Sequence, residues 1–330
     1  MRRSKLPANS AFLAVGLTLF CALMFTGQVL PASGWRGPEP KDLAQATSTR
    51  IVLPIIMRFI SWAPWLNRIN EIRQSAALPI IGSNVDWSAG AAAHARYIVN
   101  TGTLLPYEDA LSPHYTPEGN LAATFSLQLG QTTANYSDLQ AIDFWIRSPF
   151  QALSLLDPQW SETGFGSYRD VNGGLYDTGA VLDVARGFNP TPAVTLPVYW
   201  PGNGSTTSLK AYSGADNPDP HLYSNCASAN GLPIILQVGL GDASVSLTGS
   251  TPTVIRLNNN PIAHCAFTES EFTIPSDQDA TEAGRLLLGQ RDAVVMMPTS
   301  PLAVGAYNVS VTVLVNNVTR TYTWNFTVVN

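Results

Sequence analysis

The chain has 330 residues, a formal net charge of −5 and only 12% charged residues. This length is sufficient for two ordinary domains, each with a core of its own. No basic run or stripe follows the N-terminal segment, which argues against a nucleic-acid-binding surface.

The N-terminus has the layout of a targeting segment. It begins with the basic sequence MRRSK, continues with an almost wholly apolar run over residues 11–27, and reaches a small-x-small cleavage context at Ala32-Ser33-Gly34. The apolar run is short for a membrane span, which needs roughly 20 residues. We therefore predict a signal peptide at residues 1–34 and a secreted, extracellular protein. The alternative is that this segment is an uncleaved N-terminal membrane anchor. Residues 35–61 are predicted to be a lead-in segment between it and the first domain.

Two helices are predicted at the start of a first domain, which we place at residues 62–187. The first helix ends at Leu78-Pro79. An alanine-rich second helix is expected from about Asp86 to Val99, with Thr101-Gly102 as its stop. The apolar positions that recur at helical spacing in the first helix are Leu66, Ile69, Ile72 and Ala76.

The rest of the first domain is predicted to mix loop, helix and strand. Residues 103–136 have little periodicity and are expected to be a long loop. Ser137 and Gln140 then form an S-x-x-Q capping box, which predicts a third helix. Two strands, GFGSY and AVLDVARG, follow and are joined by a turn at 172–174. This alternation favours a three-layer α-β-α sandwich.

The second half of the chain has the pattern of an all-β domain. After a proline-containing linker at 188–197, residues 198–330 contain short strand-like runs separated by turn residues. The last two runs, YNVSVTVLV and TRTYTWNFTVV, alternate with period two and predict a hairpin around Asn316-Asn317. Seven or so strands in this length predict an immunoglobulin-like (Ig-like) β-sandwich.

Two cysteines remain once the predicted signal peptide is removed. Cys21 lies in that segment, whereas Cys226 and Cys265 both lie in the second half. In an exported protein the simplest reading is one disulfide, which would close a large loop and stabilise the fold by about 4 kcal/mol. Two free buried thiols are the alternative.

Several short motifs of residues 62–187 occur together in a known family. The helix pair carries N-x-x-R, an LPxI turn and A-x-x-H-A-x-Y, and the later part carries Trp145, Ser148-Pro149, LSLLDP and GFG. In this order they resemble the CAP superfamily (cysteine-rich secretory protein, antigen 5 and pathogenesis-related 1; SCP-like extracellular domain), in its bacterial form. The resemblance implies an α-β-α fold around a cavity with two histidines and two acidic residues, often seen with a divalent metal.

The resemblance implies two histidine positions, and this chain departs from at least one of them. His114 fits the family motif H-x-[ST]-P-[DE]-G, in the sequence HYTPEG. A second alignment instead places Pro106 at the histidine of an H-x-E motif, with Glu108 as its acid. The other histidine belongs in S-P-x-H, where Gln151 stands, and glutamine is a poor ligand for transition metals.

The acidic positions are also incomplete. The family motif G-E-N-[LI] reads Gly-Asn-Leu at 119–121, with Glu118 adjacent as a substitute. Asp138 and Asp143 lie on the predicted third helix, where the family often carries its other acid. One histidine with one or two carboxylates is a weak set for zinc, so His114 is only a possible ligand and no cofactor is expected.

These departures favour a non-catalytic extracellular protein that binds a ligand or acts as a scaffold. The expected partner is an extracellular ligand such as a lipid or a cell-surface polymer, without nucleic acid. A CAP-type metal-dependent hydrolase that uses His114 with Glu118 or Asp143 is one alternative. A carrier of apolar ligands is another, with a cavity lined by Tyr115, Phe125 and Phe150, although core packing is the more ordinary role for these aromatic rings.

Overall fold

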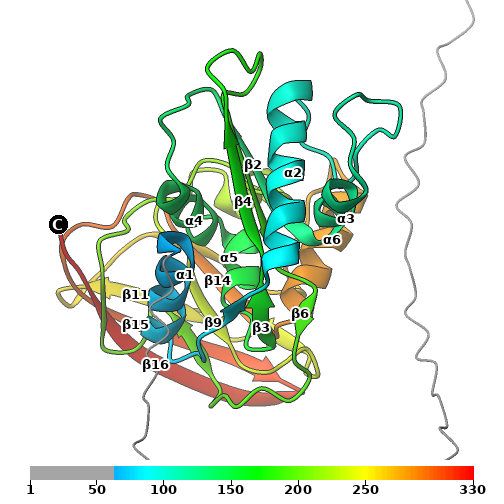
Figure 1. Cartoon of the computed structure of the whole chain (residues 1–330). Coiled ribbons are helices and arrows are strands. Elements are labelled where there is room, and N and C mark those ends of the chain that lie inside the picture. Colours follow the sequence, from blue (N-terminus) through cyan, green and yellow to red (C-terminus); the bar gives the residue numbers. More distant parts are fainter. Residues whose placement is uncertain (1–62) are drawn as a thin grey trace, which may run out of the picture. The chain divides into compact units, whose positions relative to one another are not determined.

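The structure is a computed structural model, and it describes residues 63–330. The chain divides into two units, residues 1–57 and 58–330, and the fold below is that of the second unit (Figure 1). The predicted signal peptide and lead-in segment therefore lie outside the described residues. Within residues 63–330, no helix is long and apolar enough to cross a membrane.

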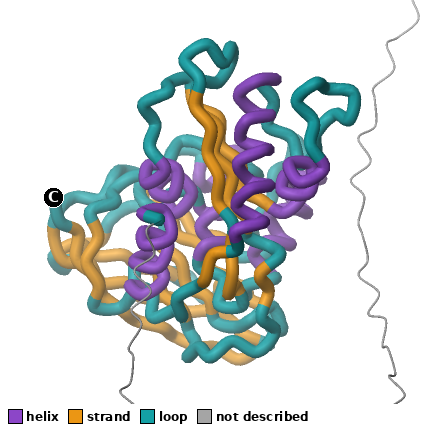
Figure 2. The backbone as a smooth tube through the Cα atoms, in the orientation of Figure 1, coloured by secondary structure: helices purple, strands orange, loops and turns teal. Residues whose placement is uncertain are grey.

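The first part of the described chain is built from five helices and two small sheets (Figures 1 and 2). One sheet has the strand order β2-β5-β4 and the other has the order β1-β3-β6. The helices are α1 (Pro64–Ser75), α2 (Val85–Thr101), α3 (Pro117–Phe125), α4 (Asp138–Ile146) and α5 (Pro149–Leu155). The strands are β1 (Gly82–Ser83), β2 (Ser126–Gln131), β3 (Trp160–Thr163), β4 (Phe165–Arg169), β5 (Thr178–Asp183) and β6 (Gly187–Phe188).

Local capping signals set the ends of the long helices. The side chain of Asn84 accepts hydrogen bonds from two backbone N–H groups in the first turn of α2, and Gly102 ends that helix in the left-handed conformation at φ 69°. Ser137 and Gln140 make the predicted reciprocal capping box at the start of α4. The predicted boundaries of the three helices are thus confirmed to within a few residues.

The helix α2 lies against one face of the β2-β5-β4 sheet. A Cβ atom at Gly166 would collide with the backbone of Ala92, and one at Gly179 would collide with the backbone of Ala95. Glycine on the strands and alanine on the helix therefore allow a very close approach. On the other face, the ring of Phe165 contacts Trp65 of α1 and Trp145 of α4, at centroid distances of 5.2 and 6.3 Å. Helices thus cover both faces of this sheet.

The N-x-x-R motif of α1 holds the turn that follows it. Asn70 exchanges hydrogen bonds with the backbone of Ile81, from side-chain amide to carbonyl oxygen and from backbone N–H to side-chain oxygen. The fully buried Arg73 guanidinium donates to the carbonyl oxygens of Pro79, Leu155, Asp157 and Trp160, at 2.9–3.0 Å. Burial lowers the pKa of Arg73 to about 10, and the Asp157 carboxylate opposes that shift.

The second part of the chain contributes two larger sheets and one helix. One sheet has the order β13-β14-β9-β7, and the other has the order β12-β11-β15-β16-β8 with β10 beside β15. The strands are β7 (Val198–Trp200), β8 (Ser205–Thr207), β9 (Ile234–Gln237), β10 (Val245–Leu247), β11 (Thr253–Leu257), β12 (Asn260–Pro261), β13 (His264–Phe267), β14 (Ala293–Pro298), β15 (Gly305–Val315) and β16 (Val318–Val328). The helix is α6 (Gln278–Gly289), and two 3-10 turns are η1 (Pro220–Leu222) and η2 (Ser224–Cys226).

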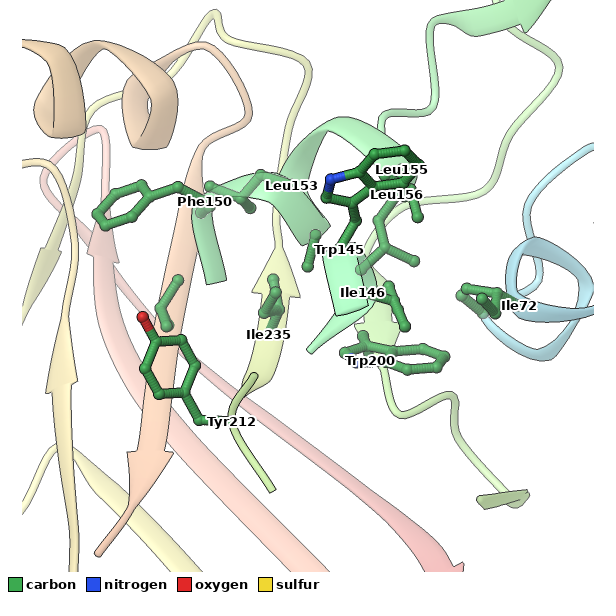
Figure 3. Packing of buried hydrophobic residues seen from close by; sticks show 14 of the residues in the cluster. Ile72, Trp145, Ile146, Phe150, Leu153, Leu155, Leu156, Trp200, Tyr212 and Ile235 are labelled. Carbon is green, nitrogen blue, oxygen red and sulfur yellow. The ribbon is translucent and has the colours of Figure 1, made fainter. Parts of the chain in front are cut away.

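The β13-β14-β9-β7 sheet is buried on both faces. Along β14, Val294 and Met296 belong to the core shared with the other large sheet, whereas Val295 and Met297 belong to the core shared with the helices. Figure 3 shows the second of these cores, in which Phe150 and Leu153 of α5 lie beside Ile235 of β9. The helical part and the β-rich part are therefore joined by one continuous hydrophobic core, and the mixed α+β class is confirmed.

Two sequence-based expectations were wrong. Residues 103–136 are not a loop throughout, because α3 and β2 lie within them. The helix α3 begins at a Thr116 cap followed by Pro117, but it has only nine residues and is rich in small side chains, so it lacks a clear apolar period. The second half is not all-β, because α6 starts from an Asp277 cap and buries only a narrow stripe against the core.

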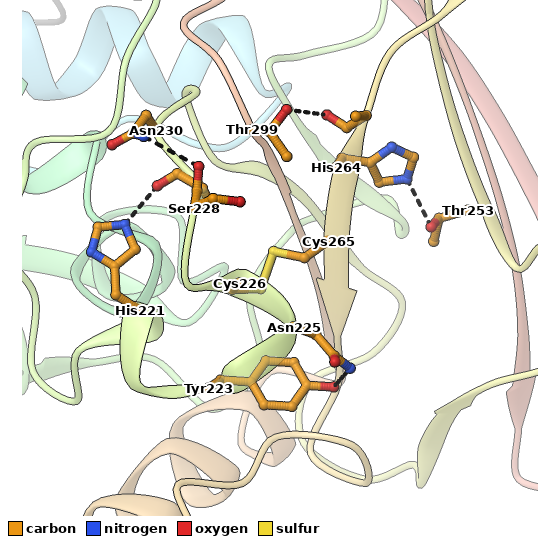
Figure 4. Close-up of a disulfide and its surroundings, with 12 residues drawn as sticks. His221, Tyr223, Asn225, Cys226, Ser228, Asn230, Thr253, His264, Cys265 and Thr299 are labelled. Carbon is orange, nitrogen blue, oxygen red and sulfur yellow. Dashed lines mark hydrogen bonds between the residues drawn. A yellow bond between two sulfur atoms is a disulfide. The ribbon is translucent and has the colours of Figure 1, made fainter.

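The predicted hairpin and disulfide are both confirmed. The strands β15 and β16 pair without a break from Gly305–Val328 to Val315–Val318, and Asn316 and Asn317 both have positive φ in the turn. Figure 4 shows the bond between Cys226 and Cys265, whose Cα atoms are 5.3 Å apart. It fastens η2 to β13 on the helix-facing side of its sheet.

Removal of the Phe150 ring tests the shared core. This ring is 1% exposed and contacts Phe267 and Phe272 at centroid distances of 5.9 and 5.0 Å. The Phe150→Ala variant should lose about 3–5 kcal/mol of unfolding free energy, measured by urea denaturation, while a single transition is kept.

Leu111→Ala is the matched control, because this side chain is 92% exposed and should be neutral. Two separate transitions, with only one of them shifted by Phe150→Ala, would show that the helical and β-rich parts unfold independently.

Candidate functional site

A groove of about 520 Å³ runs along the whole of β2. Its remaining walls come from the segment at 104–106, from α4 and α5, and from the loop at 215–217. The lining residues are Leu104, Leu105, Pro106, Ser126, Leu127, Gln128, Leu129, Gly130, Gln131, Phe144, Gln151, Ala215, Asp216 and Asn217. The groove thus combines apolar side chains with amides, one hydroxyl and one carboxyl group.

Gln151 reaches the groove because it is the residue of α5 that the core leaves uncovered. The other six residues of this seven-residue helix, Pro149–Leu155, are buried. A side chain in this position can present its amide to the groove while its helix is held from the other sides. The sequence-predicted candidate Gln151 therefore lies at the groove.

Asp216 caps α5 from a distant part of the chain. Ser148 stands at the N-cap but makes no capping hydrogen bond, since its hydroxyl is engaged with Ser213 and Ala215. The Asp216 carboxyl accepts the backbone N–H of Phe150 at 2.7 Å instead, and its other oxygen accepts the N–H of Asn217 at 2.8 Å. A loop 66 residues further on therefore supplies what the local sequence does not.

The electrostatic state of Asp216 is unusual for a carboxyl group. Burial raises the pKa of Asp216 to about 8, although the backbone N–H groups that it accepts pull the pKa down. The carboxyl is therefore largely protonated and neutral near pH 7. Among residues 63–330, no lysine, arginine or histidine lines the groove, so these residues give the site no formal positive charge.

Three polar side-chain atoms at the groove have unused hydrogen-bonding capacity. Within residues 63–330, the buried Ser126 Oγ, Gln128 Oε1 and Gln151 Oε1 atoms have no hydrogen-bond partner. The Nε2 group of Gln128 is engaged, because it donates to the carbonyl oxygens of Leu105 at 2.9 Å and Ala123 at 3.2 Å. These bonds hold the segment at 104–106 beside β2.

A buried hydrogen bond between His94 and Glu108 anchors the loop that forms one wall of the groove. His94 Nδ1 lies 2.9 Å from Glu108 Oε1, and both side chains are almost fully buried. Glu108 Oε2 accepts the backbone N–H of Thr116 at 2.8 Å, and the Glu108 N–H donates to Asn120 Oδ1 at 2.8 Å. The Glu108 carboxylate therefore points into the interior, next to α2 and α3, and fixes the residues on either side of it.

The predicted cavity residues are distributed over several places. His114 is exposed in the loop before α3, and Glu118 is exposed in the first turn of α3. Asp143 of α4 forms an ion pair with Arg68 of α1 at 2.7 Å. Of the candidates, Gln151 lines the groove, whereas His114, Glu118 and Asp143 do not. Pro106, which stands at a histidine position in the second alignment, also lines the groove.

The donors at the groove do not fit the divalent metal that the resemblance suggested. Zinc and related metals take imidazole, thiolate and ionised carboxylate ligands. The groove offers side-chain amides and one carboxyl whose pKa is raised, and among residues 63–330 no three His, Cys, Asp or Glu side chains gather into a metal-binding group.

Two residues of the site were missed from the sequence. Asp216 lies in the loop GADNPDP, whose acids and prolines are typical of an ordinary turn. Gln128 lies in the stretch 103–136 that was expected to be loop. Neither position carries a local signal of its role, because each acts on a segment that only the fold brings near.

Replacement of Asp216 should change how stability depends on pH. The folded carboxyl, with its raised pKa, retains a proton that the unfolded chain releases above about pH 4. Its contribution to stability is thus full below about pH 4 and is lost as the pH rises through about 8. The stability of the Asp216→Asn variant relative to the native protein should therefore rise with pH across this window.

Urea denaturation at pH values of about 5, 6.5 and 8 measures this difference. Asp279→Asn, in the exposed first turn of α6, controls for the removal of one negative charge. A constant difference between Asp216→Asn and the native protein at all three pH values would contradict the raised pKa.

The hydrogen bonds of Glu108 can be tested in the same way. Glu108→Ala should lower the unfolding free energy by about 1–3 kcal/mol for each group left without a partner, namely the buried imidazole of His94 and the Thr116 N–H. Glu108→Gln keeps an acceptor oxygen in place and should recover part of that loss. A cost below about 1 kcal/mol for Glu108→Ala would show that the pair does not hold the loop.

Comparisons with known proteins agree with the motifs of the first part of the chain. The family model described as CAP, the cysteine-rich secretory protein family, matches residues 66–181. No curated protein matches the chain. A solved structure of selenomethionine PcoC, a copper resistance protein from Escherichia coli, is 16% identical and covers 40% of this chain and 95% of that chain. The TM-score of this match is 0.20. Residues 66–181 are a CAP domain of the cysteine-rich secretory protein family.

Proposed function

We propose that this chain is a secreted, non-catalytic CAP-domain protein that binds an extracellular ligand in the groove along β2. The single observation that carries the proposal is the composition of this groove. Pro106 and Gln151 occupy the two histidine positions of the second alignment, and both line it. The side chains that remain can form hydrogen bonds and apolar contacts, as ligand-binding sites in general do.

The one titratable side chain of the groove is already used for structure. Both oxygens of Asp216 accept backbone N–H groups that hold α5 and the loop at 215–217 in place. A general acid or base must instead be free to exchange a proton with a substrate within hydrogen-bonding reach. No histidine of the described residues lines the groove and could act as the acid or base.

Other features of the chain support an extracellular location. The disulfide between Cys226 and Cys265 is typical of exported proteins. The basic and then apolar N-terminus fits a signal peptide, as the sequence predicts.

We further propose that the two large sheets form an accessory module of the Ig-like type. The hydrophobic core between the two sheets supports this proposal. The parallel pairing of β8 with β16 departs from the antiparallel sheets of an Ig-like sandwich.

The two alternatives have less support. A hydrolase built on His114 would need Glu118 or Asp143 to act with it, but His114 and Glu118 are both exposed, and Asp143 is paired with Arg68. A lipid carrier with Phe150 in its cavity wall is weakened because this ring is packed against Phe267 and Phe272. The mixed polar lining of the groove favours a ligand that forms hydrogen bonds.

Metal content separates the binding protein from the hydrolase. After equilibration with zinc and dialysis, the native protein should retain far less than one zinc per chain, as measured by mass spectrometry of the element. The Pro106→His/Gln151→His variant should retain more, since it places two imidazoles at the same groove, and Gln151→His alone is the control. One zinc per native chain that is lost in His114→Ala would support the hydrolase and refute the proposal.

A further inference from the structure

The strand β2 is an edge strand of its sheet, and it faces the groove. It stands at the end of the order β2-β5-β4, and β5 is its partner among residues 63–330. Natural edge strands are commonly blunted by charge, proline, a bulge or a covering segment. The sequence of β2, SLQLGQ, has no charge and no proline, and its pairing with β5 continues without a shift over all six residues.

The register shows which backbone groups of β2 point away from the sheet. The Val184 N–H donates to the Phe125 carbonyl oxygen, so this opposed pair is of the hydrogen-bonded type. Such pairs alternate along antiparallel strands, which places Leu127 and Leu129 in the pairing with β5. The N–H and C=O groups of Gln128 and Gly130 consequently point to the open edge, about 6.8 Å apart along the strand.

The groove lies beside these groups and has two walls. One wall contains Phe144 and Gln151 and lies on the side of the helical core, to which Leu129 also belongs. The other wall is the segment at 104–106, which Gln128 holds through the carbonyl of Leu105. An added strand would place alternate side chains against these two walls, because successive side chains of a strand point to opposite faces.

The charges at the groove restrict the chemistry of an occupant. In the part of the chain that the structure describes, no lysine, arginine or histidine lines it, so a ligand carboxylate or phosphate would lose hydration without gaining a counter-charge there. The carboxyl group of Asp216 would not repel a neutral or basic side chain of the ligand. The apolar leucines favour uncharged side chains on the ligand.

We propose that the groove binds an extended peptide segment without acidic side chains, which adds to the sheet as a strand against Gln128 and Gly130. This inference rests on the proposed function, namely that the groove is the binding site, and it specifies the ligand class. The backbone N–H and C=O groups of the peptide complete the hydrogen bonds of the β2 edge, which is the mode known as β-augmentation. Side-chain contacts with the leucines and amides of the two walls then select the sequence.

The test uses a synthetic heptapeptide as the probe. It is acetylated and amidated, alternates threonine with valine, and carries one lysine for solubility. The purified full chain should bind it in titration calorimetry. The same peptide with N-methyl groups on alternate residues should bind at least about tenfold more weakly, because it cannot donate the backbone hydrogen bonds to the β2 edge. Exchange of its lysine for glutamate should also weaken binding.

Two variants at one position place the peptide on the β2 edge. Gln128→Pro removes the outward N–H, whereas Gln128→Ala removes the same side-chain bonds to Leu105 and Ala123 and keeps that N–H. Because both variants lose the side-chain bonds, Gln128→Ala is the reference, and Gln128→Pro should bind the peptide more weakly than Gln128→Ala. Circular dichroism establishes whether both variants fold. If the proline variant does not fold, the N-methylated peptide and the native protein still test whether backbone hydrogen bonds hold the peptide.

Each outcome bears on the inference separately from the proposed function. Equal binding of the plain and N-methylated peptides, or no binding of any peptide, overturns strand addition. In parallel, a chitin-type oligosaccharide and phosphatidylcholine vesicles are titrated against the native protein and Gln151→Trp, which fills the groove. Binding of either probe that this variant abolishes would keep the groove as a binding site but replace the peptide as its ligand. Retention of one zinc per native chain that His114→Ala abolishes would instead refute the proposed binding function.

Discussion

The burial of α5 between the helices and the β13-β14-β9-β7 sheet is the constraint on which the remaining structure depends. Six of its seven residues are buried, and the rings of Phe150, Phe267 and Phe272 pack together across the contact. A helix of this length is not stable alone, since too few hydrogen bonds offset the ordering of its backbone. It persists because both parts of the chain cover it and because Asp216 caps it. The CAP domain is therefore completed by residues that lie outside it in the sequence.

The same packing explains where the groove lies. Because α5 is covered on its other sides, Gln151 is left to face the edge of β2. The loop that supplies the Asp216 cap necessarily passes beside it and forms part of the wall. On the opposite wall, the pair of His94 and Glu108 fixes the segment that contains Pro106. The groove is thus bounded by groups that hold the fold together and by the edge of β2.

Much of the fold could be predicted from the sequence, because the relevant signals are local. The capping box at Ser137 and the stop at Gly102 act within a few residues, and so do the asparagines of the β15–β16 turn. The helix α3 was missed because its small residues give no apolar period. The helix α6 was missed because it lies within a strand-rich half and its buried face, which includes Thr281 and Gly284, is narrow. Of the candidate site, Gln151 was identified from a motif, whereas Asp216 and Gln128 were not.

The sequence by itself determined the helices α1, α2 and α4, the β15–β16 hairpin, the membership of residues 66–181 in the CAP family and the cysteine pair that forms the disulfide. Each of these depends on residue types at short or fixed spacing. Only the tertiary structure decided that the two parts share one core and that Asp216 caps α5. It also decided that Pro106 and Gln151 line the same groove beside β2. These relations join residues that are tens of positions apart, and the packing of several elements at once, rather than any local pattern, brings them into contact.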